Sequence, residues 1–259
     1  MSTVAEVLST RTKSNQGSLI GYFPAGYPTV DASVEALVAM ANNGCNVLEI
    51  GVPYSDPVMD GPVIQRATEK ALASGFKLRM LFEVLSKVRA KTDVPILVMS
   101  YWNPIIRFGL NAFAESLKDS GAQGLITPDL IPDEAGEWIA VSDQLGLERI
   151  FLAAPSSSED RVERVVANSR GFVYAVSTMG ITGERAKLDE LARRVVSRVR
   201  KAGSIPTCVG VGVSTAEQVR EVNSYADGAI VGTAFIKTYE DGGLAGLTHK
   251  VRDLAQGLG

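Results

Sequence analysis

The recurrence of strand-length apolar runs limits the fold of this chain more than any other feature. The runs are near-continuous rather than strictly alternating, which is typical of strands buried on both faces, as in parallel sheets. Segments with a 3.6-residue apolar period separate the runs, for example at Val34, Leu37, Val38 and Ala41. The eight runs cover roughly 18–22, 46–51, 95–101, 124–128, 149–154, 171–176, 207–212 and 228–232.

Strands that alternate with helices predict a parallel α/β architecture with right-handed crossovers. Eight such units in 259 residues favour one closed (βα)8 barrel, the TIM barrel, over an open doubly wound sheet. No linker or shift in composition divides the chain, so we expect residues 1–259 to form a single domain. Val4, Val7 and Leu8 predict an extra N-terminal helix that plugs the bottom of the barrel.

Two connections between the expected strands are long. The one after strand 2 has room for two helices, near 61–73 and 77–91, and the one after strand 6 opens with the glycine-containing segment 177–185. Long loops that follow strands are where barrel enzymes keep their chemistry. In the second loop, Gly180 and Gly183 are candidates for the hinges of a lid.

Composition excludes several classes of function. The net charge is -3, from 26 Lys and Arg against 29 Asp and Glu, so no overall positive field favours nucleic acid or an anionic membrane. The apolar runs fall far short of the ~20 residues needed to span a bilayer, and the polar N-terminus has no apolar core of a secretory signal. Cys45 and Cys208 sit inside apolar runs, which predicts two buried thiols and a reducing, cytoplasmic location.

His249 is the only histidine, which restricts the chemistry available. A Ser-His-Asp triad, a multi-histidine zinc site or a Cys-His pair would all have to use it. It lies off the apolar stripe formed by Leu247, Val251 and Leu254, so we expect it on a solvated helix face. Carboxylates, tyrosines and lysines are therefore the candidates for proton transfer, and no metal site is expected.

Glu49 is the most informative acidic residue. Period-2 geometry puts Val47 and Glu49 on one face of strand 2 and the bulkier Leu48 and Ile50 on the other. The bulkier pair should meet the helices, so Glu49 should project into the barrel, where burial raises the pKa of a carboxyl. Either Glu49 is catalytic, or a neighbouring Tyr or Ser hydroxyl satisfies it structurally.

Two further acids, Asp56 and Asp60, follow strand 2 in a proline-rich loop at the same end of the barrel. Asp60 is open to two interpretations, because Asp is a common N-cap and Pro62 would suit the first turn of a helix. Together with Glu49, however, Asp60 would place two carboxyls over one cavity. Two such groups suit general acid–base catalysis at two points of one substrate.

The ends of the last two strands predict a phosphate site. Strand 7 ends in Gly210–Gly212, and Ser214 and Glu217 have the spacing of a capping box at the start of a helix. Strand 8 ends in Gly232 and Thr233. Glycines let backbone N–H groups approach an anion, a helix start adds a favourable dipole, and barrels commonly bind phosphate here.

The segment 48–65, LEIGVPYSDPVMDGPVIQ, resembles the signature of the tryptophan synthase alpha subunit family. An E-x-G-x-P-aromatic-S-D-P-x-x-D-G-P pattern is hard to reach by chance. The resemblance continues through Tyr22 with Ala25-Gly26, Tyr101–Pro104, Pro128-Asp129, Tyr174, Gly180–Gly183, Gly210–Gly212 and Gly232-Thr233. The chain is thus identified as similar to that family over nearly its whole length.

The resemblance implies a lyase that cleaves indole-3-glycerol phosphate to indole and glyceraldehyde 3-phosphate, with no metal or organic cofactor in this chain. It implies that Glu49 acts first as acid and then as base, and that Asp60 accepts the indole N–H and stabilises positive charge on the ring. The residues expected to bind or position the substrate are Tyr22, Tyr101, Tyr174, Gly183, Gly212, Gly232 and Thr233.

The resemblance also implies a partner. The family subunit works beside a beta subunit that holds pyridoxal phosphate and receives indole through a tunnel, in an α2β2 complex. Loops that would face this beta subunit contain Asp56, Pro57, Asn103, Pro104, Asp129 and Pro132.

Some positions depart from the common family pattern. Met59 stands where a small residue is frequent, Tyr27 where Asp is frequent, and Phe172 where some members have a second tyrosine. Thr233 replaces a frequent Ser and keeps the hydroxyl. None of these changes removes a group expected to be catalytic.

Three other functions are compatible with parts of the sequence. A non-catalytic barrel that regulates a partner would keep the phosphate site and partner loops but would not need both carboxyls. A stand-alone lyase would use the same chemistry and release free indole. A phosphosugar isomerase would share the phosphate site but would not require the loop that carries Asp56 and Asp60.

Overall fold

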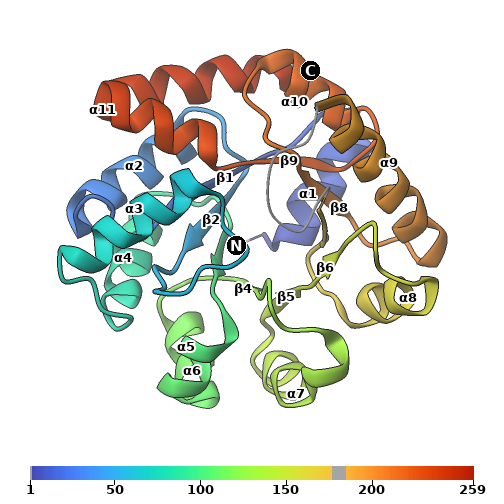
Figure 1. The fold of residues 1–259 in the computed structure, drawn as a ribbon, viewed down its shortest axis with the longest axis horizontal. Helices are drawn as coiled ribbons and strands as arrows, with labels where there is room; N and C mark the ends of the chain where they lie inside the picture. Colours follow the sequence, from blue (N-terminus) through green and yellow to red (C-terminus); the bar gives the residue numbers. More distant parts are fainter. Residues whose placement is uncertain (1, 177–184) are drawn as a thin grey trace.

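The computed structural model describes residues 2–176 and 185–259, in which parallel strands form a ring surrounded by helices (Figure 1). Every pairing of neighbouring strands in this part of the chain is parallel, in the order β5-β4-β3-β2-β1-β9-β8-β7-β6. The strands are β1 (Leu19–Pro24), β2 (Val47–Gly51), β3 (Ile96–Met99), β4 (Gly124–Ile126), β5 (Glu148–Ile150), β6 (Leu152–Ala153), β7 (Val173–Val176), β8 (Thr207–Gly210) and β9 (Gly228–Val231).

The sheet closes through Phe151. β5 and β6 stand at opposite ends of the strand order, yet only this residue separates them in the chain. β5 pairs with β4, β6 pairs with β7, and the Phe151 carbonyl accepts a hydrogen bond of 3.0 Å from the Tyr174 N–H. The two short strands therefore fill the place of the single strand expected over 149–154, and the (βα)8 barrel prediction is confirmed.

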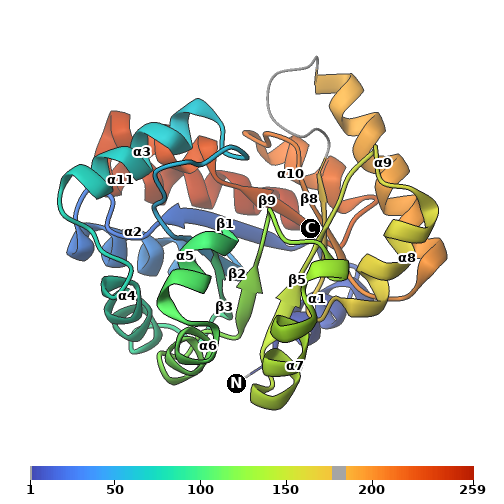
Figure 2. The same cartoon turned by 60° about the horizontal axis from the view of Figure 1, so that its bottom comes forward.

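The helices lie outside the ring of strands, as two views of the ribbon show (Figures 1 and 2). The connection after β2 carries two of them, α3 and α4, as its length predicted. The outer helices are α2 (Val30–Asn42), α3 (Pro62–Ala73), α4 (Met80–Arg89), α5 (Trp102–Phe108), α6 (Leu110–Asp119), α7 (Gly136–Leu145), α8 (Glu159–Asn168), α9 (Arg185–Ala202), α10 (Ala216–Asn223) and α11 (Thr233–Ala255). Short 3-10 turns cover Pro132–Glu134 and Gln256–Leu258.

The extra N-terminal helix is present as α1 (Val4–Lys13), and it plugs one end of the barrel. Val4 and Leu8 are fully buried and pack against the apolar side chains that point inward. Glu148 fixes the start of α1, because its carboxylate accepts the backbone N–H groups of Val4 and Ala5, each at 3.0 Å. The inward-pointing apolar side chains of the strands are Ile20, Val47, Leu97, Ile126, Ile150, Cys208 and Ile230, joined by Phe172 just before β7.

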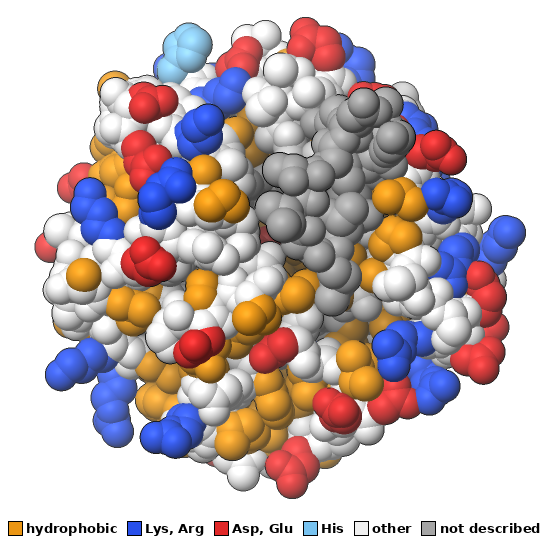
Figure 3. Space-filling view, viewed as in Figure 1, with side chains coloured by type: hydrophobic (Ala, Val, Ile, Leu, Met, Phe, Trp, Pro, Cys, Tyr) orange, Lys and Arg blue, Asp and Glu red, His pale blue; other side chains and the backbone are white. Residues whose placement is uncertain are grey.

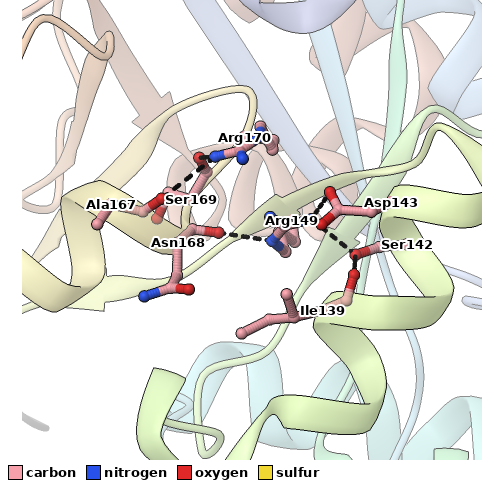
Figure 4. Close-up of polar contacts among 8 residues, drawn as sticks. All are labelled: Ile139, Ser142, Asp143, Arg149, Ala167, Asn168, Ser169 and Arg170. Carbon is pink, nitrogen blue, oxygen red and sulfur yellow. Dashed lines mark hydrogen bonds and ion pairs between the residues drawn. The ribbon is translucent and has the colours of Figure 1, made fainter.

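Arg149 shows how period-2 alternation connects the barrel to its helices. Glu148 and Ile150 point inward, so Arg149 between them points outward, where it is 1% exposed. Its guanidinium donates to the Asn168 carbonyl at 2.6 Å, the Ser142 hydroxyl at 2.9 Å and the Asp143 carboxylate at 2.5 Å (Figure 4). This pairing satisfies a charge that would otherwise be costly to bury and joins β5 to α7 and α8.

The expected burial of the two cysteines and exposure of the histidine are confirmed. Cys45 and Cys208 are free and buried, and burial raises the pKa of both thiols. His249 is exposed on α11. Over 2–176 and 185–259, none of the helices combines the length and the apolar character required to cross a bilayer.

Candidate active site

A cavity of about 570 Å³ lies at the carboxyl ends of the strands, opposite α1. Its wall comes from strands β1, β2, β3, β7, β8 and β9, the loop after β2, and the first turns of α3 and α11. This volume suits a small-molecule ligand. A second hollow, of about 540 Å³, lies beside α1 at the other end, away from the carboxyls described next, and Arg11 in its wall is already bonded to the Gly17 carbonyl.

Glu49 lies in this cavity on the inner face of β2, as the alternation predicted. The residue is 1% exposed, and its Oε2 atom has no hydrogen-bond partner in the described part of the chain. Burial, and then the nearby charge of Asp60, raise the pKa of Glu49 to about 8. No neighbouring hydroxyl in the described part of the chain satisfies the Oε2 atom of Glu49, and the raised pKa favours the protonated form of this carboxyl near neutral pH.

Asp60 lines the same cavity and does not cap a helix. The N-cap of α3 is Gly61, followed by Pro62, so the interpretation of Asp60 as an N-cap is wrong. Burial raises the pKa of Asp60 to about 6, and a hydrogen bond from Tyr101 works in the opposite direction. The backbone around it is fixed, because Gln65 donates to the Asp60 carbonyl at 2.9 Å and the Met59 N–H donates to the Tyr101 hydroxyl at 2.9 Å.

Tyr22 and Tyr174 border the cavity beside the two carboxyls, and glycines make room for both rings. A Cβ atom at Gly51 would lie 2.2 Å from the Tyr22 hydroxyl, and one at Gly210 would lie 2.7 Å from the Tyr174 hydroxyl. Burial, with the charges of Glu49 and Asp60, raises the pKa of both tyrosines. Tyr101 has a different place: it touches the Asp60 loop and is not among the described residues that line the cavity.

A smaller, apolar compartment of about 150 Å³ adjoins the cavity, and we call it the inner compartment. The two spaces share Met59, Met99, Tyr174 and Gly210. The other side chains of the inner compartment are apolar, and they are Ile126, Pro128, Leu152 and Val176. A flat apolar ring placed here would lie between the strand ends and the Asp60 loop.

The predicted phosphate residues Gly212, Gly232 and Thr233 also line the cavity, where β8 and β9 lead toward α10 and α11. Gly212 has a φ of 67°, a conformation that favours glycine. Gly232 is the N-cap of α11, and Thr233 is its first residue. Because glycine has no side chain, a ligand can approach the backbone closely at Gly212 and Gly232.

The predicted capping box at Ser214 and Glu217 is wrong by one residue. Thr215 is the N-cap of α10, and its side chain accepts the N–H of Gln218, whose side chain returns a hydrogen bond. Thr and Gln satisfy the same geometric requirement as Ser and Glu, which is why spacing alone misplaced the helix start. Ser214 lines the cavity, with its N–H bonded to Gln218 at 2.7 Å.

Lys237 is a cavity residue that the sequence analysis missed. No motif marks it, but it lies four residues after Thr233 on α11, so the two share a helix face. Gly180 and Gly183, the expected hinge and phosphate residues after strand 6, lie outside the described residues.

Most of the predicted partner-loop residues lie at the surface. Asp56, Asn103 and Asp129 are exposed, and Pro57 and Pro104 are partly exposed, whereas the side chain of Pro132 is buried within this chain. Asn103 and Pro104 lie in the first turn of α5 and not in a loop, so that part of the prediction is wrong. Two apolar side chains near these residues are unusually exposed, Val58 in the loop after β2 at 75% and Ile106 on α5 at 50%. In the space-filling view, hydrophobic side chains gather in the lower half of the face, over α5, α6 and α7 (Figure 3).

Comparisons with known proteins agree with one another. A family model described as "Tryptophan synthase alpha chain" matches residues 8–256. The tryptophan synthase alpha chain of Leifsonia xyli is 53% identical over 99% of this chain and 98% of its own, and that of Thermobifida fusca is 48% identical over 100% and 97%.

Solved structures give the same result. A chain of Mycobacterium tuberculosis tryptophan synthase superimposes with a TM-score of 0.93, at 45% identity, covering 98% of this chain and 97% of that one. A mutant tryptophan synthase alpha subunit from Pyrococcus furiosus gives 0.84 at 34% identity, covering 92% and 98%. The family match over nearly the whole chain, the shared fold and the two carboxyls in one cavity lead to one conclusion: this chain belongs to the tryptophan synthase alpha chain family.

Proposed function

We propose that this chain is a carbon–carbon lyase that cleaves indole-3-glycerol phosphate to indole and glyceraldehyde 3-phosphate. The observation that carries this proposal is the pair of carboxyls in one cavity, whose pKa values are raised to about 8 for Glu49 and about 6 for Asp60. At pH 7 one carboxyl is therefore mostly an acid and the other mostly a carboxylate. Such a difference in pKa gives different roles to two similar carboxyl groups.

In the first step, protonated Glu49 donates its proton to C3 of the indole ring, which becomes tetrahedral. Positive charge then develops on the ring nitrogen, and the Asp60 carboxylate accepts the N–H hydrogen bond and stabilises that charge. Tyr101 supports this role, because its hydroxyl contacts both Asp60 and the Met59 backbone. The inner compartment offers the ring an apolar site beside these groups.

In the second step, the Glu49 carboxylate removes the proton from the hydroxyl on the side-chain carbon that is attached to C3. The O–H electrons form the carbonyl of glyceraldehyde 3-phosphate, and the C–C bonding electrons return to the ring and restore indole. One residue thus serves as acid and then as base, which requires a pKa near the working pH. Gly212, Gly232 and Thr233 would hold the phosphate through backbone N–H groups and a hydroxyl.

The same proposal includes a partner and a location. The exposed Val58 and Ile106, close in sequence to Asp56, Pro57, Asn103 and Pro104, supply apolar area in the loop after β2 and on α5. This surface would dock a tryptophan synthase beta subunit in an α2β2 complex. In that complex the beta subunit would hold pyridoxal phosphate and use the indole, and the reaction in this chain would rely on its own side chains. The two free buried thiols fit a cytoplasmic location.

An indole-release assay with purified protein, with and without a beta subunit, tests the proposal. We expect the unmodified chain to form indole, and Glu49→Gln to lose more than the roughly 10²–10⁴-fold typical of a single acid–base group. Asp60→Asn should also lose activity, by a smaller factor, because the amide still accepts the N–H. Glu115→Gln, at an exposed carboxyl on α6, is the matched control.

The outcomes separate the candidate functions. Full activity in Glu49→Gln would refute the assigned role. Absence of indole formation by the unmodified chain, both alone and with the beta subunit, would favour the non-catalytic regulator. Equal turnover with and without a beta subunit would favour the stand-alone lyase.

A further inference from the structure

Lys237 is the one cationic side chain among the described residues that line the active-site cavity. It projects from α11 one turn beyond Thr233, on the same face of the helix. Glu49 and Asp60 are the acidic side chains of this wall. The cavity therefore combines two acids, which act on one part of a substrate, with a cation that neither acid neutralises by an ion pair in the described structure.

Lys237 is exposed at the wall of the cavity, where its ammonium group is open to an incoming anion. The described residues give Lys237 no ion pair, whereas Lys87 and Lys250 pair with carboxylates at 2.9 and 3.2 Å. The acid one turn further along, Glu240, instead accepts a hydrogen bond of 3.1 Å from Tyr27.

The unpaired Oε2 of Glu49 independently indicates that the cavity is completed by a ligand. A ligand with a dianionic end would be repelled by ionised Asp60 and attracted by Lys237. The backbone N–H groups of Gly212 and Gly232 supply dipoles but no net charge. A lysine supplies the charge, and as a point cation it suits a phosphate in any rotation.

We propose that Lys237 binds the phosphate of the substrate and thereby selects substrates that carry a dianion at the end of the side chain. This role rests on the proposed lyase function and deepens it. Lys237 is a positioning and specificity residue: it takes no part in proton transfer. It directs the phosphate away from Asp60, so that the indole end of the substrate is the end that meets the two carboxyls.

Steady-state kinetics of Lys237→Gln test this role. Loss of a hydrogen bond to a charged group at a partly open site predicts a rise in KM for indole-3-glycerol phosphate of about tenfold or more, with kcat changed less than about threefold. Product inhibition distinguishes the phosphate end of the cavity from the indole end, because each product occupies one of them. The inhibition constant of glyceraldehyde 3-phosphate should rise by a similar factor, while that of indole stays unchanged.

Two variants control the test. Lys237→Arg keeps a cation and should recover most of the affinity. Lys250→Gln removes a lysine from the same helix outside the cavity and should leave all constants unchanged. Equal rises in the inhibition constants of glyceraldehyde 3-phosphate and indole, or no rise in either, would overturn the role of Lys237.

A measurement that needs no turnover separates this role from the lyase proposal. Inorganic phosphate binding, followed by calorimetry, should weaken in Lys237→Gln and not in Lys250→Gln. Weakened binding in a chain that forms no indole would refute the lyase function and keep the anion site. Unchanged binding would refute the anion site whatever the activity.

Discussion

Glu49→Gln should do more than inactivate the protein: it should change how stability depends on pH. Burial raises the folded-state pKa of Glu49 to about 8, against an ordinary value of 4.5 in the unfolded chain. Between these values the folded protein keeps a proton that the unfolded chain has released. Stability therefore falls as pH rises through this range, because the unfolded state binds fewer protons.

The size of the effect follows from that difference in bound protons. Between pH 5.5 and 7.5 the folded state holds nearly one proton more at this site, and each pH unit then changes stability by about 1.4 kcal/mol. The unmodified protein should lose about 2 kcal/mol relative to Glu49→Gln over those two units. A buried amide has its own unsatisfied groups, so the pH-dependent part of the comparison carries the information, and the absolute difference does not.

Urea unfolding followed by circular dichroism, at both pH values and for both proteins, measures this effect. Glu115→Gln again serves as the control, since its carboxyl is exposed. A free-energy difference between Glu49→Gln and the unmodified protein that is the same at pH 5.5 and 7.5 would refute the raised pKa of Glu49. The assignment of Glu49 as the acid of the first step would then fall with it.

Two further predictions follow from other contacts. The pH profile of kcat/KM should rise as Asp60 ionises near 6 and fall as Glu49 loses its proton near 8. In Asp60→Asn the alkaline limb, measured on residual activity, should move to lower pH, because the charge of Asp60 no longer raises the pKa of Glu49; an unmoved limb would contradict their coupling. Glu148→Gln should leave one N–H of α1 without an acceptor, at a cost of about 1–3 kcal/mol, and should speed amide hydrogen exchange in α1; unchanged exchange there would show that this carboxylate does not fix the helix.

The barrel could be predicted from the sequence because it depends on periodicity. Buried parallel strands and amphipathic helices leave apolar patterns of different period, so the strands, the helices after β2 and the plugging helix were all placed. The inward direction of Glu49 followed from alternation along one strand. The break at Phe151 did not, because Phe151 is itself a buried apolar residue and continues the apolar run from Ile150 to Leu152 without a turn residue to mark an interruption.

The candidate site was predicted only where a local pattern marks a residue. Spacing could not tell Ser214 from Thr215 as the cap of α10, and the sequence pattern did not reveal that Gly61, and not Asp60, caps α3. Lys237 lies in an ordinary amphipathic helix, and only the fold brings it to the cavity. Surface position is also a property of the fold, which is why the burial of Pro132 was not foreseen.

Helix α1 and the inward apolar layer prevent a ligand from passing through the barrel along its axis. In the described residues, the layer from Ile20 to Ile230 fills the axis of the barrel, and Val4 and Leu8 close it from beneath. Across this part of the chain, the barrel is therefore open only at the rim formed by the carboxyl ends of its strands. Entry of the substrate and departure of both products must share that rim, so a protein that takes one product directly has to bind there, without blocking the route by which the other product leaves.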